Sequence, residues 1–214
     1  MRIKDFIYYL KKLIGDGHKW QYTDINEKGN KPKFFFNGTQ YFCIVFSIIA
    51  LRLNKSGFND AFSGYIIAAL SLFVGLFLTL ILSVFDKYQK FPKADDTVSF
   101  REKTLEDQRK TFIKQFIALT SYAILISILC IFLLGFSLLF DFLNQNIFEY
   151  QLVKSFEKIS YIEIINSIKF ILIIIYRLIT VYFILDFLLI VIYSLTSIYT
   201  YIDLEINKNK QDSK

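Results

Sequence analysis

The sequence has few of the residues from which metal centres and nucleophilic sites are built. Its 214 residues include one histidine, His18, and two cysteines, Cys43 and Cys130, each inside an apolar run. One histidine and two cysteines are too few for a Cys/His zinc site, and their placement predicts no Cys–His nucleophile. The eight glycines never cluster as GxGxxG or GxxxxGK, which excludes the usual phosphate loops. We expect no cofactor, no metal and no enzyme activity.

Charge is missing from two long stretches of the chain. Residues 61–85 and 116–140 contain no Asp, Glu, Lys or Arg, and 54% of the whole sequence is hydrophobic. A bilayer core of about 30 Å is crossed by roughly 20 helical residues at 1.5 Å each, so each run is long enough to cross it. The sequence therefore predicts an all-α integral membrane protein with several spans.

Two further segments complete a predicted bundle of four transmembrane helices. Residues 170–202 are apolar except for Arg177 and Asp186. The first segment is weaker, because residues 41–51 are continuously apolar but the stretch reaches span length only by including Asn37, Gln40 and Arg52. We expect the bundle to occupy residues 41–203, with spans at about 37–54, 61–85, 116–140 and 175–202.

The distribution of basic residues predicts the orientation of these spans. With four spans, one side holds 19 Lys and Arg and the other holds 5. Without the first span, the totals become 13 and 11, which is no bias. The positive-inside rule then places both termini in the cytoplasm. The segments expected there are 1–40, 86–115 and 204–214, and those expected outside are 52–60 and 141–169. The excess of Phe, Tyr and Lys over Trp and Arg is typical of an A/T-rich bacterial genome, so we expect a multi-pass protein of the bacterial inner membrane.

The first 14 residues predict a short amphipathic helix on the cytoplasmic side. They lack the continuous apolar centre and the cleavage site of a signal peptide. The helix is expected to end at Gly15 and Gly17. It either lies in the plane of the membrane, with its lysines near anionic lipid, or packs on the protein's own cytoplasmic part. Its apolar residues recur at helical spacing: Ile3, Phe6, Ile7, Leu10, Leu13 and Ile14.

Small residues recur along one face of the second predicted span, at steps of three and four. They are Ala61, Gly64, Ala68, Ser71, Gly75 and Thr79. Helices in lipid gain little from the hydrophobic effect, so they associate closely over small residues. The stripe favours contact with another helix of the same chain. Contact between protomers and the lining of a pore are the alternatives.

The fourth predicted span carries two charges, nine residues apart and therefore on opposite faces of a helix. Arg177 is expected near the outer end, where its side chain can snorkel to the headgroups. Asp186 lies deeper, at a cost of about 2.5–3.5 kcal/mol for a central Asp on the insertion scale. It is either part of an aqueous path or satisfied by tyrosine or serine hydroxyls of a neighbouring helix. The polar residues expected on its face are Tyr182, Tyr193, Ser197 and Thr200.

Two functional classes fit these features. One is an oligomeric channel-like or membrane-permeabilising protein, and the other is a non-conducting scaffold that anchors a cytoplasmic partner. In its spans and topology, the chain resembles the small multi-span membrane effectors of bacterial antiviral defence. That resemblance implies a homo-oligomer, controlled by a cytoplasmic protein or nucleotide signal, that disrupts the membrane when released. It includes no motif, so it assigns no residue roles.

The basic excess of the predicted cytoplasmic segments also bears on partners. With Asp203 at their edge included, these segments hold 19 basic and 13 acidic residues, and anionic membrane lipid explains the excess. Nucleic acid or a nucleotide is the weaker interpretation. It rests on basic and aromatic residues that are mixed as in single-strand binders, namely Lys19, Trp20, Tyr22, Lys31, Lys33 and Phe34.

Overall fold

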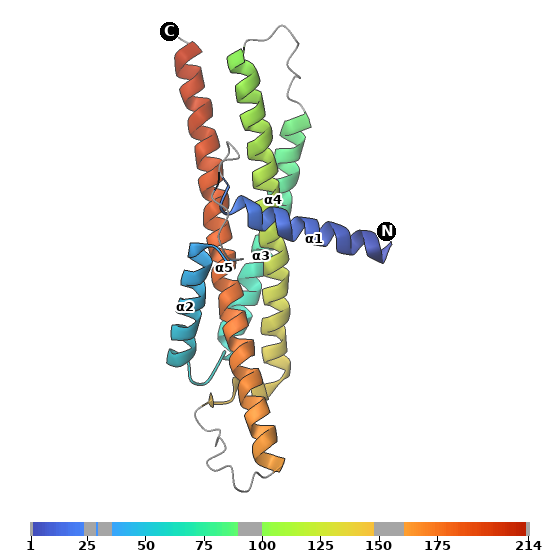
Figure 1. The fold of residues 1–214 in the computed structure, drawn as a ribbon, viewed down its shortest axis with the longest axis vertical. Helices are drawn as coiled ribbons and strands as arrows, with labels where there is room; N and C mark the ends of the chain where they lie inside the picture. Colours follow the sequence, from blue (N-terminus) through green and yellow to red (C-terminus); the bar gives the residue numbers. More distant parts are fainter. Residues whose placement is uncertain (1, 24–28, 30–35, 90–99, 148–160, 213–214) are drawn as a thin grey trace. The chain divides into compact units, whose positions relative to one another are not determined.

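The computed structural model describes residues 2–23, 29, 36–89, 100–147 and 161–212, and these ranges are helical and contain no strand. The all-α prediction is therefore confirmed for this part of the chain. Figure 1 shows the elements. In chain order they are α1 (Ile3–Trp20), α2 (Gly38–Leu53), α3 (Asp60–Gln89), α4 (Phe100–Leu139), the 3-10 helix η1 (Asp141–Asn144) and α5 (Tyr161–Asp212).

Three helices are long and apolar enough to cross a membrane, which is compatible with a multi-pass membrane protein. The qualifying stretches are Asp60–Gln89, Glu106–Leu139 and Tyr161–Asp203. They coincide with the three stronger predicted spans. The first predicted span differs in length rather than in position, because α2 lies within one residue of the expected bounds 37–54 at each end. It has only 16 residues and a length of about 24 Å, which is less than the bilayer core of about 30 Å.

The two ends of α4 compare differently with the sequence. At its start, the i,i+4 spacing of Glu106 and Lys110 predicts that the helix extends beyond the apolar run into a charged segment. The structure has this extension, with Lys110 Nζ 2.7 Å from Glu106 Oε1. The predicted external loop 141–169 is shorter, because η1 follows α4 closely and α5 already begins at Tyr161. Apolar residues at 148, 152, 156 and 159 recur at helical spacing and predict a short amphipathic helix on the outer surface, but this segment lies outside the described residues.

The chain divides into two compact units, and the long helices contribute to both. Unit 1 comprises Met1–Asn37, Val74–Leu125 and Phe187–Lys214, and unit 2 comprises Gly38–Phe73 and Ile126–Asp186. In unit 1, the buried residues Phe112, Ile113 and Phe116 form an apolar cluster on α4. Tyr201 of α5 stacks on Phe112 with ring centroids 4.4 Å apart, which joins the two helices within this unit.

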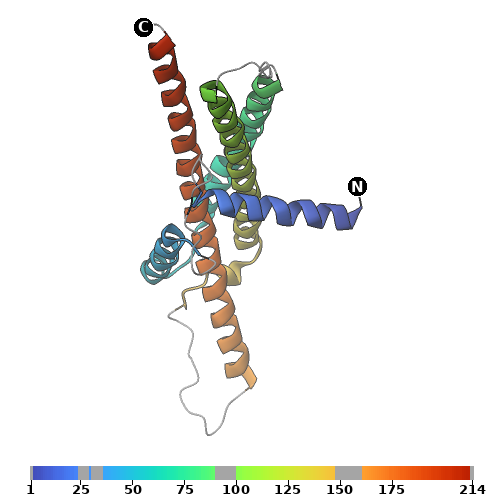
Figure 2. The same ribbon diagram turned by 45° about the horizontal axis from the view of Figure 1, so that its top comes forward.

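Within unit 1, α1 runs across α4 and α5 rather than along them (Figure 1, Figure 2). It continues through both glycines to Trp20, so the predicted end at Gly15 and Gly17 is wrong. The reason is a close approach, since a Cβ at Gly17 would lie 2.5 Å from the Cβ of Tyr122. Glycine at this position allows α1 to touch α4 while remaining helical.

The apolar face of α1 is uncovered over its first turns. Ile3 is 79% exposed, Phe6 55% and Ile7 45%. Burial begins only near Gly17 and Trp20, where the helix meets the rest of unit 1. Of the two alternatives for this helix, the exposure favours the in-plane one, because only the last turns pack on the protein itself.

In unit 2, α2 lies alongside the first half of α5 (Figure 1). The unit has an apolar cluster of Leu143, Ile147 and Ile173, beside the connection that follows α4. Its interior also holds an unusual number of polar side chains for helices of this composition. The buried polar residues of unit 2 are Gln40, Ser47, Ser63, Ser127, Ser137, Arg177, Thr180 and Asp186.

Candidate functional site

Asp186 lies inside unit 2 with 1% of its surface exposed. The side-chain amide of Gln40, near the start of α2, hydrogen-bonds to its carboxylate. Its second oxygen, Oδ1, has no hydrogen-bond partner among the residues that the structure describes. Asp186 is therefore enclosed by protein in this chain, which favours the structural alternative over an aqueous path.

The partner of Asp186 was not identified from the sequence. Gln40 was considered only as a polar interruption of a weak span, and hydroxyls were expected in its place. Polar side chains in neighbouring membrane helices commonly hydrogen-bond to one another, because hydrocarbon offers no other partner. The signal that could have found the pair is that Gln40 and Asp186 are both strongly polar side chains next to long apolar stretches of predicted membrane helices.

The polar residues predicted around Asp186 fall into two environments. Tyr182 is half-buried and belongs to unit 2 with Asp186. Tyr193, Ser197 and Thr200 belong to unit 1. There they line a small cavity of about 150 Å³ at the end of α1. The Oγ of Ser197 donates to Oε1 of Gln115 at 3.4 Å, and Nε2 of Gln115 donates to the Thr23 carbonyl at 3.3 Å.

Arg177 does not snorkel, so that expectation is wrong. Its side chain is 2% exposed and binds backbone carbonyl oxygens inside unit 2. Nε and Nη2 donate to Leu143 at 3.1 and 2.8 Å. Nη2 also donates to Gln145 at 2.6 Å, and Nη1 donates to Lys55 at 3.1 Å. The flat guanidinium with its five N–H groups suits several carbonyls at once.

The physical reason for this placement is that chain connections leave carbonyls without helical partners. Lys55 belongs to the connection between α2 and α3, while Leu143 and Gln145 belong to the connection after α4. The connection between α2 and α3 also needs a glycine beside the arginine. Gly57 has φ +79°, and a Cβ there would lie 2.6 Å from Nη2 of Arg177. Backbone acceptors leave no signal in a sequence, so this cluster could not be predicted.

The small-residue stripe of α3 is exposed among the residues that the structure describes. All six residues are exposed, and a Cβ added at Gly64 or Gly75 would meet nothing within 4 Å. The opposite face of the helix is packed, with Ser63 and Leu70 buried. The favoured interpretation, contact with another helix of the same chain, is therefore not found within the described ranges. Ala61, Gly64, Ala68, Ser71, Gly75 and Thr79 are left for a protomer contact or a pore lining.

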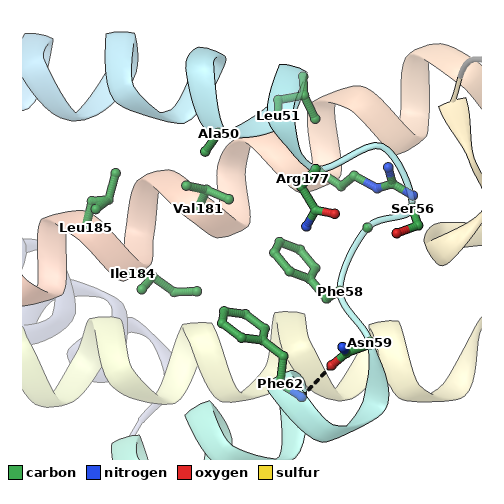
Figure 3. A pocket seen from close by; sticks show the side chains of 12 residues that line it. Ala50, Leu51, Ser56, Phe58, Asn59, Phe62, Arg177, Val181, Ile184 and Leu185 are labelled. Atoms are coloured by element: carbon green, nitrogen blue, oxygen red, sulfur yellow. Dashed lines mark hydrogen bonds between the residues drawn. The ribbon is translucent and has the colours of Figure 1, made fainter.

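A larger cavity of about 380 Å³ opens beside Arg177 in unit 2 (Figure 3). Residues of α2, α5 and the connection between α2 and α3 form its walls, and most of them are apolar. No protein-family model, curated protein or solved structure matches the chain. Its function is therefore inferred from the geometry of these sites and from the arrangement of its membrane helices.

Proposed function

We propose that this protein is an oligomer of the bacterial inner membrane and acts as a channel-like or membrane-permeabilising effector. The observation that carries the proposal is the α3 stripe, which is exposed along its full length while the opposite face of the same helix is packed. Small residues let two helix backbones approach closely, and this contact drives association where the hydrophobic effect cannot.

The hydroxyls of the stripe also suit a contact in the membrane. Ser71 donates to the Ile67 carbonyl at 2.8 Å, and Thr79 donates to the Gly75 carbonyl at 3.0 Å. Because both hydroxyls already donate to a backbone carbonyl, another helix can cover this face without leaving them unpaired. Since Asp186 is enclosed beside Gln40, we place a conducting path between protomers, along α3, rather than next to Asp186.

The proposal retains four crossings with both termini in the cytoplasm. A helix as short as α2 can cross where the bilayer thins locally or flanking residues reach the interface. The distribution of 19 basic residues against 5 supports this orientation. The organisation-level resemblance to antiviral effectors supports control by a cytoplasmic protein, which would contact the charged start of α4 and the segments around it.

The experiment is a test of the stripe as the contact between protomers. Gly64→Leu and Gly75→Leu should each convert the oligomer to smaller species in mild detergent, measured by light scattering on a sizing column. Both positions are open, so the protomer should fold unchanged. Ala69→Leu is the matched control, because Ala69 is exposed on the same helix but lies off the stripe. If the double variant keeps the oligomer of the unmodified protein, the stripe is not the contact.

A scaffold that conducts nothing is the second candidate. The burial of Asp186 favours it, since the only carboxylate in the apolar part of α5 does not face water in this chain. The basic cytoplasmic segments would then recruit a partner to the membrane, and the oligomer would serve to present several copies of them. Ion flux separates the two candidates, because a scaffold predicts none.

A further inference from the structure

We propose that the cavity beside Arg177 binds one acyl chain of an anionic membrane phospholipid, with the phosphate of the headgroup at the arginine end. The cavity lies wholly within unit 2 and its volume of about 380 Å³ is within the range of small-molecule sites. The inference is independent of the oligomer, because no residue of the α3 stripe lines the cavity.

The walls of the cavity are suited to a hydrocarbon chain. Figure 3 shows that side chains from two sides converge on it, with Val181, Ile184 and Leu185 coming from α5. Ala50 and Leu51 of α2 face them, and the rings of Phe58 and Phe62 close a third side. Apolar cavities do not hold water, and an empty one forfeits dispersion contacts. In a membrane helix bundle, the apolar molecule always at hand to fill such a space is a lipid chain.

One end of the same cavity is polar and positively charged. Ser56 lies beside the guanidinium of Arg177 there (Figure 3), and Asn54 and Asn59 also line the cavity. The carbonyl groups around Arg177 accept its hydrogen bonds but leave its full positive charge in place. Two exposed basic residues, Arg52 and Lys55, flank the cavity in sequence. An apolar cavity with a positively charged end is complementary to a phospholipid, whose acyl chain is apolar and whose headgroup here is negatively charged.

The small side chain of Ala50 leaves space in the cavity for an acyl chain. Ala50 is half-buried on α2 and its side chain faces the α5 residues across the cavity. A phenyl group at this position would occupy the space of the acyl chain without adding charge. The same substitution at Ala69, which is exposed on α3 outside the cavity, provides the matched control.

The test uses native mass spectrometry of the full-length protein with phosphatidylglycerol or phosphatidylcholine of identical acyl chains. The unmodified protein should retain one phosphatidylglycerol per protomer in preference to phosphatidylcholine. Ala50→Phe should weaken that retention by about tenfold, which corresponds to about 1.4 kcal/mol, while Ala69→Phe should not. Lys55→Gln should reduce the preference for the anionic lipid and leave acyl-chain binding in place.

Two results would overturn the proposal. Equal lipid retention by Ala50→Phe and Ala69→Phe would show that lipid binds elsewhere on the surface. Equal retention of the two lipids by the unmodified protein would remove the role of the positive end. Leu185→Trp fills the cavity from α5 and controls for the possibility that Ala50→Phe acts by disturbing the folding of α2. It should lose phosphatidylglycerol as Ala50→Phe does.

Discussion

The carbonyl oxygen of Leu143 receives two hydrogen bonds from Arg177, from Nε at 3.1 Å and from Nη2 at 2.8 Å. This pair fixes the connection after α4 to the side of α5. The remaining donors of the same guanidinium hold Gln145 and Lys55, so one buried side chain fixes two chain connections of unit 2. Hydrogen bonds from a charged donor are stronger than neutral ones, and few side chains could replace this one.

Loss of Arg177 should therefore destabilise the protein strongly. Arg177→Met takes both arginine donors from the buried carbonyl of Leu143 and one donor each from the partly buried carbonyls of Gln145 and Lys55, at about 1–3 kcal/mol for an acceptor left unsatisfied. A total of about 3 kcal/mol would lower the melting temperature by about 6–12 °C for a chain of this size. The control is Arg52→Met, since Arg52 is exposed at the end of α2. Equal melting temperatures for the two variants in detergent would contradict the structural role of Arg177.

The pair of Asp186 and Gln40 should be coupled in stability. Gln40→Leu removes the hydrogen bond to a buried carboxylate and should cost about 1–3 kcal/mol. In a double-mutant cycle with Asp186→Leu, the second change should cost much less once the first is present. Asp186→Asn should change melting temperature or yield but leave ion selectivity alone. Altered selectivity at unchanged stability would instead place Asp186 on an aqueous path.

The contact between α1 and α4 can be observed directly, because Trp20 is the only tryptophan and is 7% exposed. Gly17→Leu would clash with Tyr122 and should lift the end of α1 from unit 1. Tryptophan emission should then shift to longer wavelength as Trp20 meets water. Gly15→Leu should leave the emission unchanged, since nothing lies within 4 Å of a Cβ at Gly15. The same emission from both variants would rule out this contact.

Topology distinguishes four crossings from three. In a background without Cys43 and Cys130, single cysteines replace Lys11, Lys55 and Lys103, which are all exposed. With four crossings, an impermeant thiol reagent added to spheroplasts should label only the cysteine at position 55. If α2 does not cross, positions 11 and 55 lie on the same side, so they should be either both labelled or both protected. Labelling at position 11 with protection at 103 would therefore overturn the placement of the N-terminus.

Charge and apolar patterning were sufficient to predict the all-helical fold and the three long spans, because hydrocarbon tolerates few alternatives to a helix of about 20 apolar residues. They also placed α2 to within one residue at each end, but its 16 residues are fewer than the roughly 20 of a typical span. The end of α1 was mispredicted. Gly17 ends a helix in isolation, but here it lies against Tyr122, and tertiary contact outweighs its local preference.

The candidate sites were predicted only where polarity was visible in the sequence itself. Asp186 was identified, but Gln40 was not recognised as its partner. The burial of Arg177 was missed because its partners are backbone carbonyls, which every residue has. For the α3 stripe, spacing predicted a close-contact face, yet only the structure could show that the described residues leave this face uncovered.

Ion flux into liposomes is the most direct measurement of the proposed activity. The purified protein is free of any cytoplasmic partner that restrains it, so it should conduct. Because the path is placed between protomers, flux should rise more steeply than in proportion to the protein-to-lipid ratio. Gly75→Leu should abolish the flux and Ala69→Leu should not. Oligomeric protein that conducts no better than empty liposomes, at every ratio, would contradict the channel-like activity and leave the scaffold.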